Sequence, residues 1–282
     1  MTSPSHGGGP EFESQRAHLF FTDFYQEYCD WVYTQVARRT ARNYINYLTK
    51  YISDVQIQDI EDIQDITDNI SSGRNAFSKA MRSYLNFLVD TKRMSKERAE
   101  DWKEAMPLTK DDTDTWVPSI EQIKSTRDSC RDGVYTSMFK LLLYSGIRIS
   151  EAYHIISTFD EKRLHIVGDI AYYDLDWNRG SKKSNKAFIP SDFISGIRHR
   201  SSDIPSLDAI KTHFQRQELP LKYCRKFFIN ACYDVDIRQE YVQYMVGHIG
   251  GSVLVTNYLE KLSRSITAYK KVVPILKDIL ET

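Results

Sequence analysis

Cysteine pairs, long apolar runs and an excess of charge of one sign are all missing from this sequence. Its cysteines, Cys29, Cys130, Cys224 and Cys232, form no Cys-x-x-Cys pair and no cluster with histidine at metal-ligand spacing. That spacing excludes the common zinc motifs, and we interpret the four side chains as reduced thiols.

Two further absences bear on the surroundings of the protein. No apolar run approaches the roughly 20 residues that a membrane-spanning helix needs, and no charged-then-apolar signal segment opens the chain. We therefore expect a soluble, cytoplasmic protein with no membrane partner. The 38 basic residues are balanced by 38 acidic ones, so any nucleic-acid-binding surface must be local.

The length and apolar content favour two domains. With 282 residues, of which 41% are hydrophobic, the chain is long enough for two cores. Residues 1–14, rich in Ser, Gly and Pro, are expected to be a disordered tail or an added leader. We predict a helical domain over 15–106, a polar, acidic linker over 107–118, and a second domain over 119–282.

Apolar residues at three- and four-residue spacing predict helices in the first domain. The helices expected from this spacing are Ala17–Gln35, one that starts with Thr40 as its N-cap, and Asn75–Val89. Two short polar stretches, Gln56–Asp68 and Ser95–Met106, fit shorter helices that close the domain. The pattern therefore predicts a small all-α domain.

The second domain combines helices with a short sheet. Helices are predicted over Ser119–Thr126 and Asp132–Tyr144, and from about Ser206 to the C-terminus. Between them, β-rich segments at Arg163–Val167, Ile170–Leu175 and Ala187–Ile189 predict a small antiparallel sheet. The expected fold class is mainly α with this one sheet.

An arginine follows a helix stop in the segment Tyr144-Ser-Gly146-Ile-Arg148-Ile-Ser-Glu151. Gly146 is expected to end one helix, so Arg148 lies just before the start of the next. There it could bind a phosphate beside helix N-terminal N–H groups. The alternative is a surface arginine paired with Glu151.

A second basic cluster, Asn178-Arg-Gly-Ser-Lys182-Lys183-Ser-Asn-Lys186, lies between two predicted strands. A lysine on such a hairpin reaches easily into a neighbouring groove. A solvated turn is the alternative interpretation.

The third group is Lys222-Tyr-Cys-Arg225, then Gly247-His248, then Tyr258. With the two clusters above, this order resembles the tyrosine recombinase (integrase) family. That family's signature is an arginine box, a hairpin lysine, a His-x-x-Arg box, a Gly-His box and a nucleophilic tyrosine. The resemblance covers roughly residues 119–262 and is closest to archaeal virus and plasmid integrases and Xer-like recombinases.

The resemblance implies a site-specific recombinase that cleaves and rejoins DNA through a 3′-phosphotyrosine, without metal, other cofactor or ATP. Catalytic roles would fall on the residues that match the motifs: Arg148, Lys183, Lys222, Arg225, His248 and Tyr258. It also implies a helical first domain that clamps double-stranded DNA, and self-association into a tetrameric synapse.

This sequence departs from the family pattern at three points. Ile147 separates Gly146 from Arg148, Lys222 stands where the family usually has histidine, and His248 and Tyr258 are slightly farther apart than usual. The second departure leaves the role of Lys222 open. A lysine with a reference pKa of about 10.4 would need a shift of roughly three units to act as a base near pH 7, so we expect it to stay charged.

Local basic patches would supply the DNA contacts through phosphates, with solvated helix faces as the alternative. They comprise Arg38, Arg39, Arg42 and Lys50 in the first domain, and Arg179, Lys182, Lys186, Arg198 and Arg200 in the second.

Several alternatives stay open at this point. The general acid is Lys182, Lys183 or Lys186, of which Lys183 best matches the family's turn. The apolar-striped tail from about Ser265 to Leu280 either folds back on its own domain or docks on a neighbouring protomer. Competing functions are a catalytically inactive recombinase-fold DNA-binding protein and a type IB topoisomerase. The DNA site, cleavage in cis or in trans, and the task of integration, excision or dimer resolution are not specified.

Overall fold

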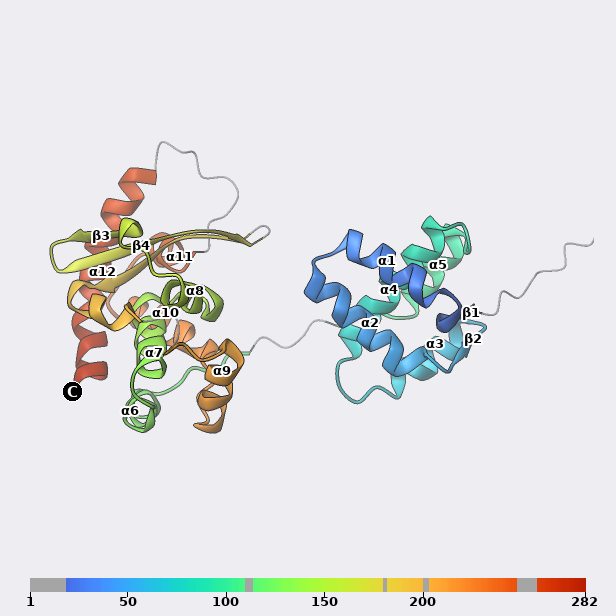
Figure 1. The fold of residues 1–282 in the computed structure, drawn as a ribbon, viewed down its shortest axis with the longest axis horizontal. Coiled ribbons are helices and arrows are strands. Elements are labelled where there is room, and N and C mark those ends of the chain that lie inside the picture. The colour runs from blue at the N-terminus through green and yellow to red at the C-terminus, as the bar shows by residue number, and fades with distance from the viewer. Residues whose placement is uncertain (1–18, 110–113, 180–181, 200–202, 248–257) are drawn as a thin grey trace, which may run out of the picture. The chain divides into compact units, whose positions relative to one another are not determined.

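The computed structural model describes residues 19–109, 114–179, 182–199, 203–247 and 258–282. The chain forms two compact units, residues 1–113 and 114–282 (Figure 1). Within the described ranges, no helix has both the length and the apolar character needed to cross a membrane.

The first unit is helical and is built around one long helix. Its elements are β1 (Leu19–Phe20), a 3-10 turn (Phe21–Phe24), α1 (Tyr25–Gln35), α2 (Arg38–Ile52), β2 (Gln56–Ile57), α3 (Ile60–Asp68), α4 (Arg74–Asp90) and α5 (Lys96–Glu104). Helix α4 packs against each of the other four helices. Buried aromatic rings fill the core: Tyr28 meets Tyr84 edge-on at 5.3 Å, and Tyr84 stacks on Phe87 at 5.9 Å between ring centroids.

Two of the predicted helix starts in this unit were wrong. The first helix begins at Tyr25 rather than Ala17, because Leu19 and Phe20 pair with Ile57 and Gln56 in a two-stranded sheet. The second begins at Arg38 with Ala37 as its N-cap, and the Thr40 N–H already donates to the Ala37 carbonyl at 2.7 Å. Thr40 therefore lies inside the first turn.

The other helices of this unit lie in the predicted segments. The helix expected over Asn75–Val89 is α4, one residue longer at each end. Within the segment Ser95–Met106, Ser95 caps α5 by accepting a hydrogen bond from the Arg98 N–H. In the stretch Gln56–Asp68 the helix is α3, which begins at Ile60, because Gln56 and Ile57 form β2. The apolar spacing predicted α4 closely, because its buried face is regular.

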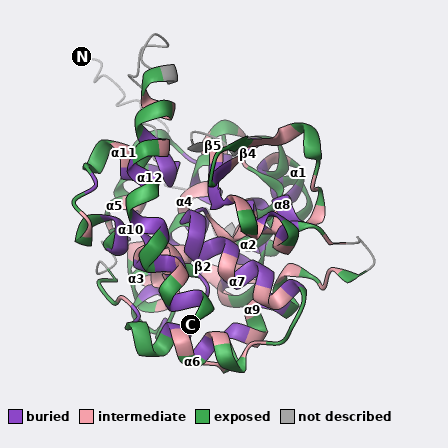
Figure 2. Cartoon of the chain, turned by 90° about the vertical axis from the view of Figure 1, so that its left-hand side faces the viewer, coloured by how far each residue is buried: buried purple, intermediate pink, exposed green. Residues whose placement is uncertain are grey.

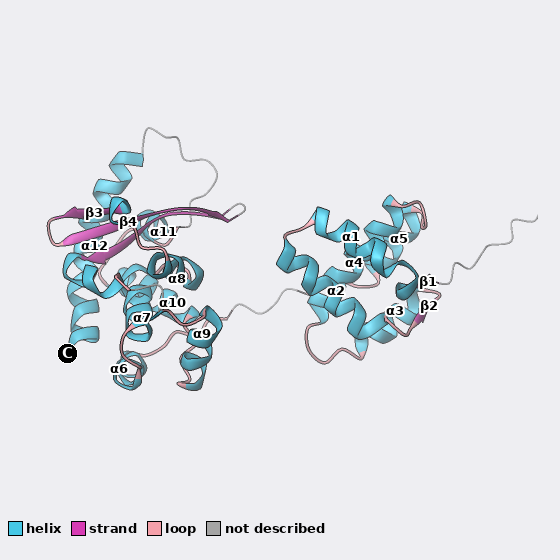
Figure 3. Ribbon diagram, viewed as in Figure 1, coloured by secondary structure: helices cyan, strands magenta, loops and turns pink. Residues whose placement is uncertain are grey.

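The second unit surrounds helix α7. Its elements are α6 (Ile120–Ser129), α7 (Val134–Ser145), α8 (Ile149–Ser157), a 3-10 turn (Glu161–Arg163), β3 (Leu164–Val167), β4 (Ile170–Arg179), β5 (Lys182–Pro190), a second 3-10 turn (Ser191–Ile197), α9 (Leu207–Arg216), α10 (Lys222–Asp234), α11 (Gln239–Met245) and α12 (Tyr258–Glu281). Nine of the twelve residues of α7 are buried (Figure 2), and α8, α10, α12 and β5 pack against it. The predicted class, mainly α with a small antiparallel sheet, is confirmed (Figure 3).

The sheet has the order β3-β4-β5 and is antiparallel throughout. All three predicted strands are present, but β4 and β5 extend much farther than expected. Asn178 pairs with Lys183 and Arg179 with Lys182, so most of the segment predicted as a turn is strand. A register shift between Asp174 and Trp177 interrupts the ladder. The polar composition of this hairpin hid its strand character, because two-residue alternation of apolar side chains is absent there.

Helix α12 starts seven residues before the predicted tail helix and packs on its own unit. Its apolar stripe, including Val272 and Leu276, is buried. The Tyr269 hydroxyl donates to the Tyr144 carbonyl at 2.8 Å, and the Tyr144 hydroxyl donates to Glu281 at 2.8 Å. Of the two alternatives for the tail, the structure therefore shows the helix folded back on its own unit.

Candidate active site

The connection between α7 and α8 sets the position of the arginine box. Gly146 ends α7 in the left-handed conformation, with φ of 60°. A Cβ on this residue would lie 2.2 Å from Cδ1 of Phe228, so both the conformation and the space require glycine. The predicted helix stop at Gly146 is confirmed. The turn brings Arg148 to the N-cap of α8, two residues later.

The Glu151 carboxylate accepts hydrogen bonds from both the main chain and the side chain of Arg148. The Arg148 N–H donates to Glu151 Oε2 at 2.7 Å, and Arg148 Nη1 donates to Oε1 at 2.7 Å. The Glu151 side chain is only 10% exposed, whereas that of Arg148 is 24% exposed. The ion pair between Arg148 and Glu151, which the sequence suggested as a surface contact, is therefore present, but it is largely buried. Such a contact orients a guanidinium at the positive end of a helix.

Arg225 reaches the same place from the first turn of α10. Its Nη1 donates to the Gly146 carbonyl at 2.9 Å, and its Nη2 is buried with no hydrogen-bond partner among the described residues. Burial, followed by the neighbouring Arg148 charge, lowers the pKa of Arg225 to about 10, while Glu151 opposes the shift. The guanidinium remains charged at neutral pH, because this pKa lies well above 7.

Two arginines and one carboxylate thus converge at the N-terminus of α8. A buried guanidinium nitrogen without a partner is costly, and an anion would satisfy it. The geometry suits a ligand with several acceptor oxygens. A phosphate group in DNA has that character.

Lys222 lies on the same helix as Arg225 but makes different contacts. Its Nζ lies 3.0 Å from Asp114 Oδ2 and 4.4 Å from the centre of the Tyr223 ring. The hydrogen bonds to Tyr223 and Asp114 raise the pKa of Lys222. This direction supports the expectation of a charged lysine and opposes a role as general base.

Lys186, one of the three hairpin lysines, forms an ion pair within the sheet. Its ammonium forms an ion pair with Asp174 and lies 4.6 Å from the centre of the Tyr172 ring, and its side chain is only 11% exposed. Asp174 Oδ2 also lies 2.7 Å from Nε2 of His165. Sequence reasoning did not single out Asp174 or His165, because their positions in two strands carry no motif.

The other two hairpin lysines and the tyrosine are placed by their backbone alone. Lys182 and Lys183 begin β5 opposite Arg179 and Asn178, and Tyr258 is the first residue of α12. The side chains of Arg179, Lys182, Lys183 and Tyr258, and the whole of Arg200 and His248, lie outside the described residues.

The basic residues proposed for DNA contact in the first unit are exposed on α2. Arg38, Arg39, Arg42 and Lys50 all belong to that helix, and Lys50 Nζ lies 4.7 Å from the centre of the Tyr51 ring. In the second unit, Arg198 is exposed and paired with Glu161 at 2.7 Å. These positions are compatible with phosphate contacts.

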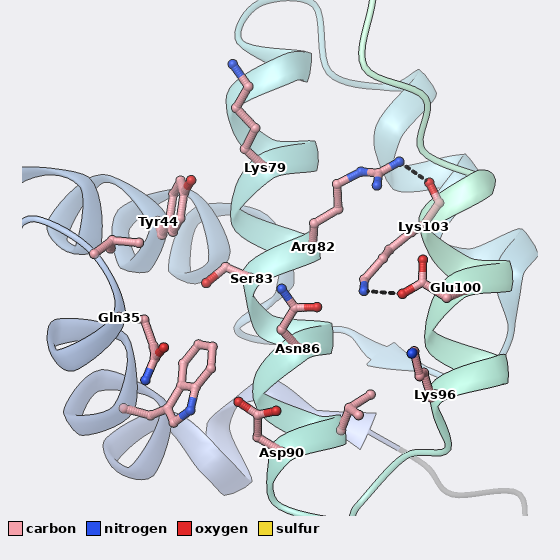
Figure 4. Close-up of a pocket in the computed structure, with 13 residues that line it drawn as sticks. Gln35, Tyr44, Lys79, Arg82, Ser83, Asn86, Asp90, Lys96, Glu100 and Lys103 are labelled. Atoms are coloured by element: carbon pink, nitrogen blue, oxygen red, sulfur yellow. Dashed lines mark hydrogen bonds and ion pairs between the residues drawn. The ribbon is translucent and has the colours of Figure 1, made fainter. Parts of the chain in front are cut away.

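The first unit also contains a polar groove of about 670 Å3. Its lining comprises Trp31, Gln35, Val36, Tyr44, Lys79, Arg82, Ser83, Asn86, Val89, Asp90, Lys96, Glu100 and Lys103. Lys79, Ser83 and Asn86 come from one face of α4 (Figure 4). On the α5 side, Lys103 is paired with Glu100 at 2.7 Å, and Arg82 donates to the Lys103 and Met106 carbonyls. Sequence reasoning missed this groove, because its residues come from α1 and its C-cap, α2, α4 and α5, which are distant in the sequence.

Among the described residues, no three histidine, cysteine or acidic side chains are placed together as metal ligands.

Comparison with known proteins assigns the family. The model for archaeal phage integrases matches residues 115–275, which is more than half of the chain. The chain therefore belongs to the tyrosine recombinases and, within them, to the archaeal phage integrase family. This confirms the resemblance seen in the motifs. No curated protein matches the sequence.

Solved structures show the same fold at low identity. A lambda integrase tetramer bound to a Holliday junction matches with 12% identity and a TM-score of 0.62, over 89% of this chain and 85% of that chain. A lambda integrase dimer bound to a COC' core site matches with 15% identity and a TM-score of 0.61, over 84% and 76%.

Proposed function

We propose that the protein is a site-specific DNA recombinase that cleaves and rejoins duplex DNA through a covalent bond between Tyr258 and a 3′-phosphate. The observation that carries the proposal is the convergence of Arg148 and Arg225 at the start of α8, where one guanidinium nitrogen has no hydrogen-bond partner among the residues that the structure describes. Membership of the archaeal phage integrase family supports DNA phosphate as the ligand of this proposed anion site.

The two arginines would hold the non-bridging oxygens of one phosphodiester. Its negative charge repels nucleophiles, so a transesterase must neutralise that charge as it grows in the transition state. Glu151 orients Arg148, and Arg225 presents Nη2, which has no hydrogen-bond partner within the part of the chain that the structure describes. With two guanidinium groups supplying the positive charge, the proposed step invokes no metal.

The Tyr258 oxygen would attack the phosphorus and pass its proton to water or to a phosphate oxygen, forming the 3′-phosphotyrosine as the bond to the 5′-oxygen breaks. A hairpin lysine, Lys183 in our assignment, would protonate that leaving oxygen, and His248 would hydrogen-bond a phosphate oxygen. The covalent bond conserves the energy of the phosphodiester. A 5′-hydroxyl can therefore reverse the step without ATP.

We propose that duplex DNA binds the first unit through the α2 residues Arg38, Arg39, Arg42 and Lys50. The polar groove beside α4 would add amide and ammonium groups such as Asn86 and Lys79. Assembly of four protomers on DNA is part of the proposal, and the DNA-bound lambda integrase tetramer of similar fold supports it.

A nicked duplex substrate tests this function. Cleavage next to the nick releases a short fragment with a 5′-hydroxyl, which diffuses away and cannot rejoin. The covalent product therefore accumulates and is seen as a slowly migrating band on a denaturing gel. The DNA should be the sequence that flanks the protein's own gene. Binding without an adduct would favour an inactive recombinase-fold protein, and relaxation of random supercoiled plasmid would favour a type IB topoisomerase.

The general acid is tested by Lys183→Ala. We expect this variant to lose cleavage of ordinary DNA but to cleave DNA with a 5′-bridging phosphorothiolate, whose sulfur leaves without a proton. Lys182→Ala and Lys186→Ala are the matched controls. We expect no selective rescue for Lys186→Ala, because the Lys186 ammonium is paired with Asp174. Rescue of Lys182→Ala instead would move the assignment by one residue.

Lys222 is expected to act as a third cationic contact on the phosphate. Lys222→Arg should keep substantial cleavage, since the charge is retained, whereas Lys222→Met should lose it at every pH. The measurement is the single-turnover rate of adduct formation from pH 6 to 9. An inactive arginine variant, with a wild-type rate that rises with a lysine-dependent pKa near 7, would make Lys222 the base.

A further inference from the structure

The segment Asp114–Trp116 is bound along one face of the helix that carries Lys222. Asp114 Oδ2 lies 3.0 Å from Lys222 Nζ, and Asp114 Oδ1 lies 3.1 Å from Lys226 Nζ. Lys226 also donates to the Trp116 carbonyl at 3.2 Å and to the Asp114 carbonyl. One carboxylate thus bridges two lysines that are one helical turn apart.

An aromatic contact fixes the same segment. The Trp116 ring meets the Tyr223 ring edge-on, with centroids 4.2 Å apart and an interplanar angle of 77°. The ammonium groups of Lys222 and Lys226 lie 4.4 and 5.1 Å from the centre of that Tyr223 ring. Three residues of α10, Lys222, Tyr223 and Lys226, therefore hold Asp114 and Trp116. The position of Asp114 is determined by more than its own ion pairs.

We propose that the Asp114 carboxylate forms an ion pair with the Lys222 ammonium in the absence of DNA. When DNA binds, its phosphate competes with Asp114 for that ammonium. This inference rests on the proposed function, in which Lys222 contacts the phosphate. A carboxylate and a phosphate bound by one ammonium lie within a few ångströms of each other and repel. Binding of the phosphate therefore requires Asp114 to release Lys222, and Lys226 keeps the carboxylate anchored when it does so.

Charge and exposure set the strength of this contact. The neighbouring lysines hold the pKa of Asp114 well below its usual range, so the carboxylate stays ionised at neutral pH. The side chains of Lys222 and Asp114 are 59% and 41% exposed. Exposed pairs are weak and screened by salt, so the competition should amount to about two- to fivefold in DNA affinity.

The experiment uses the full chain with Asp114→Asn. We expect the variant to bind nicked DNA about two to five times more tightly at low salt, and to form adduct faster by the same factor at subsaturating DNA. High salt should remove the difference. Asp208→Asn is the matched control, because Asp208 is an exposed aspartate of the same unit, paired with Lys211 at 3.1 Å. It should show no gain.

The Lys222→Met background separates competition from other effects. There, Asp114→Asn should bring no further gain in affinity, since the contested ammonium is gone. An unchanged or weakened Asp114→Asn variant, a gain that persists in Lys222→Met, or an equal gain in Asp208→Asn would each overturn the inference. Thermal unfolding of each variant excludes misfolding. Failure of the competition would leave the wild-type adduct in place, whereas failure of the proposed function would remove that adduct.

Discussion

Tyr258→Phe is expected to abolish covalent adduct formation on nicked DNA while leaving DNA affinity nearly unchanged. Only the nucleophilic oxygen is lost, and the rest of the ring is retained at the first residue of α12. The measurements are a denaturing gel for the adduct and a binding titration on the same DNA.

Tyr233→Phe is the matched control for that variant. Tyr233 is 44% exposed on α10, and no role is assigned to it. The control should form adduct at the wild-type rate. A Tyr258→Phe protein that still forms adduct would show that another of the 18 tyrosines is the nucleophile.

Arg225→Ala is expected to slow cleavage by a factor of about 10² to 10³, the usual loss when one preorganised donor to the transition state is removed. Arg225→Lys should also be strongly impaired, because a single ammonium nitrogen cannot occupy the two separate positions that Nη1 and Nη2 take in the planar guanidinium group. The measurement is the single-turnover rate at saturating DNA.

Arg216→Ala is the control for loss of one positive charge, since Arg216 is exposed at the end of α9. It should cleave at the wild-type rate. Thermal unfolding must accompany the Arg225 variants, because a buried side chain is being changed. Near-normal cleavage by a folded Arg225→Ala protein would contradict the arginine clamp.

The sequence was most informative where chemistry and local structure coincide. The glycine stop at Gly146 and the Arg148 box follow from rules that act over a few residues, and the structure has both at the α7–α8 connection. The apolar spacing of α4 and the buried stripe of α12 likewise follow from helical periodicity.

Features that depend on distant parts of the chain were not predictable. Asp114 lies in a segment interpreted as a linker, and its partner Lys222 is 108 positions away. Arg225 gave no sign in the sequence that its guanidinium would be buried beside Gly146. The predicted start of the first helix was wrong because Leu19 and Phe20 pair with a strand that follows α2. Local patterns carry no information on such pairings.

The central claim is that Tyr258 becomes linked to a DNA 3′-phosphate, and peptide mapping of the covalent product tests it most directly. The adduct formed by the wild-type chain on nicked DNA would be digested with protease and nuclease, and the modified peptide identified by mass spectrometry. Our account predicts a single modified residue, Tyr258, carrying a 3′-linked nucleotide, with a free 5′-hydroxyl on the released strand. A 5′-linked nucleotide, or a linkage to a different residue, would contradict it.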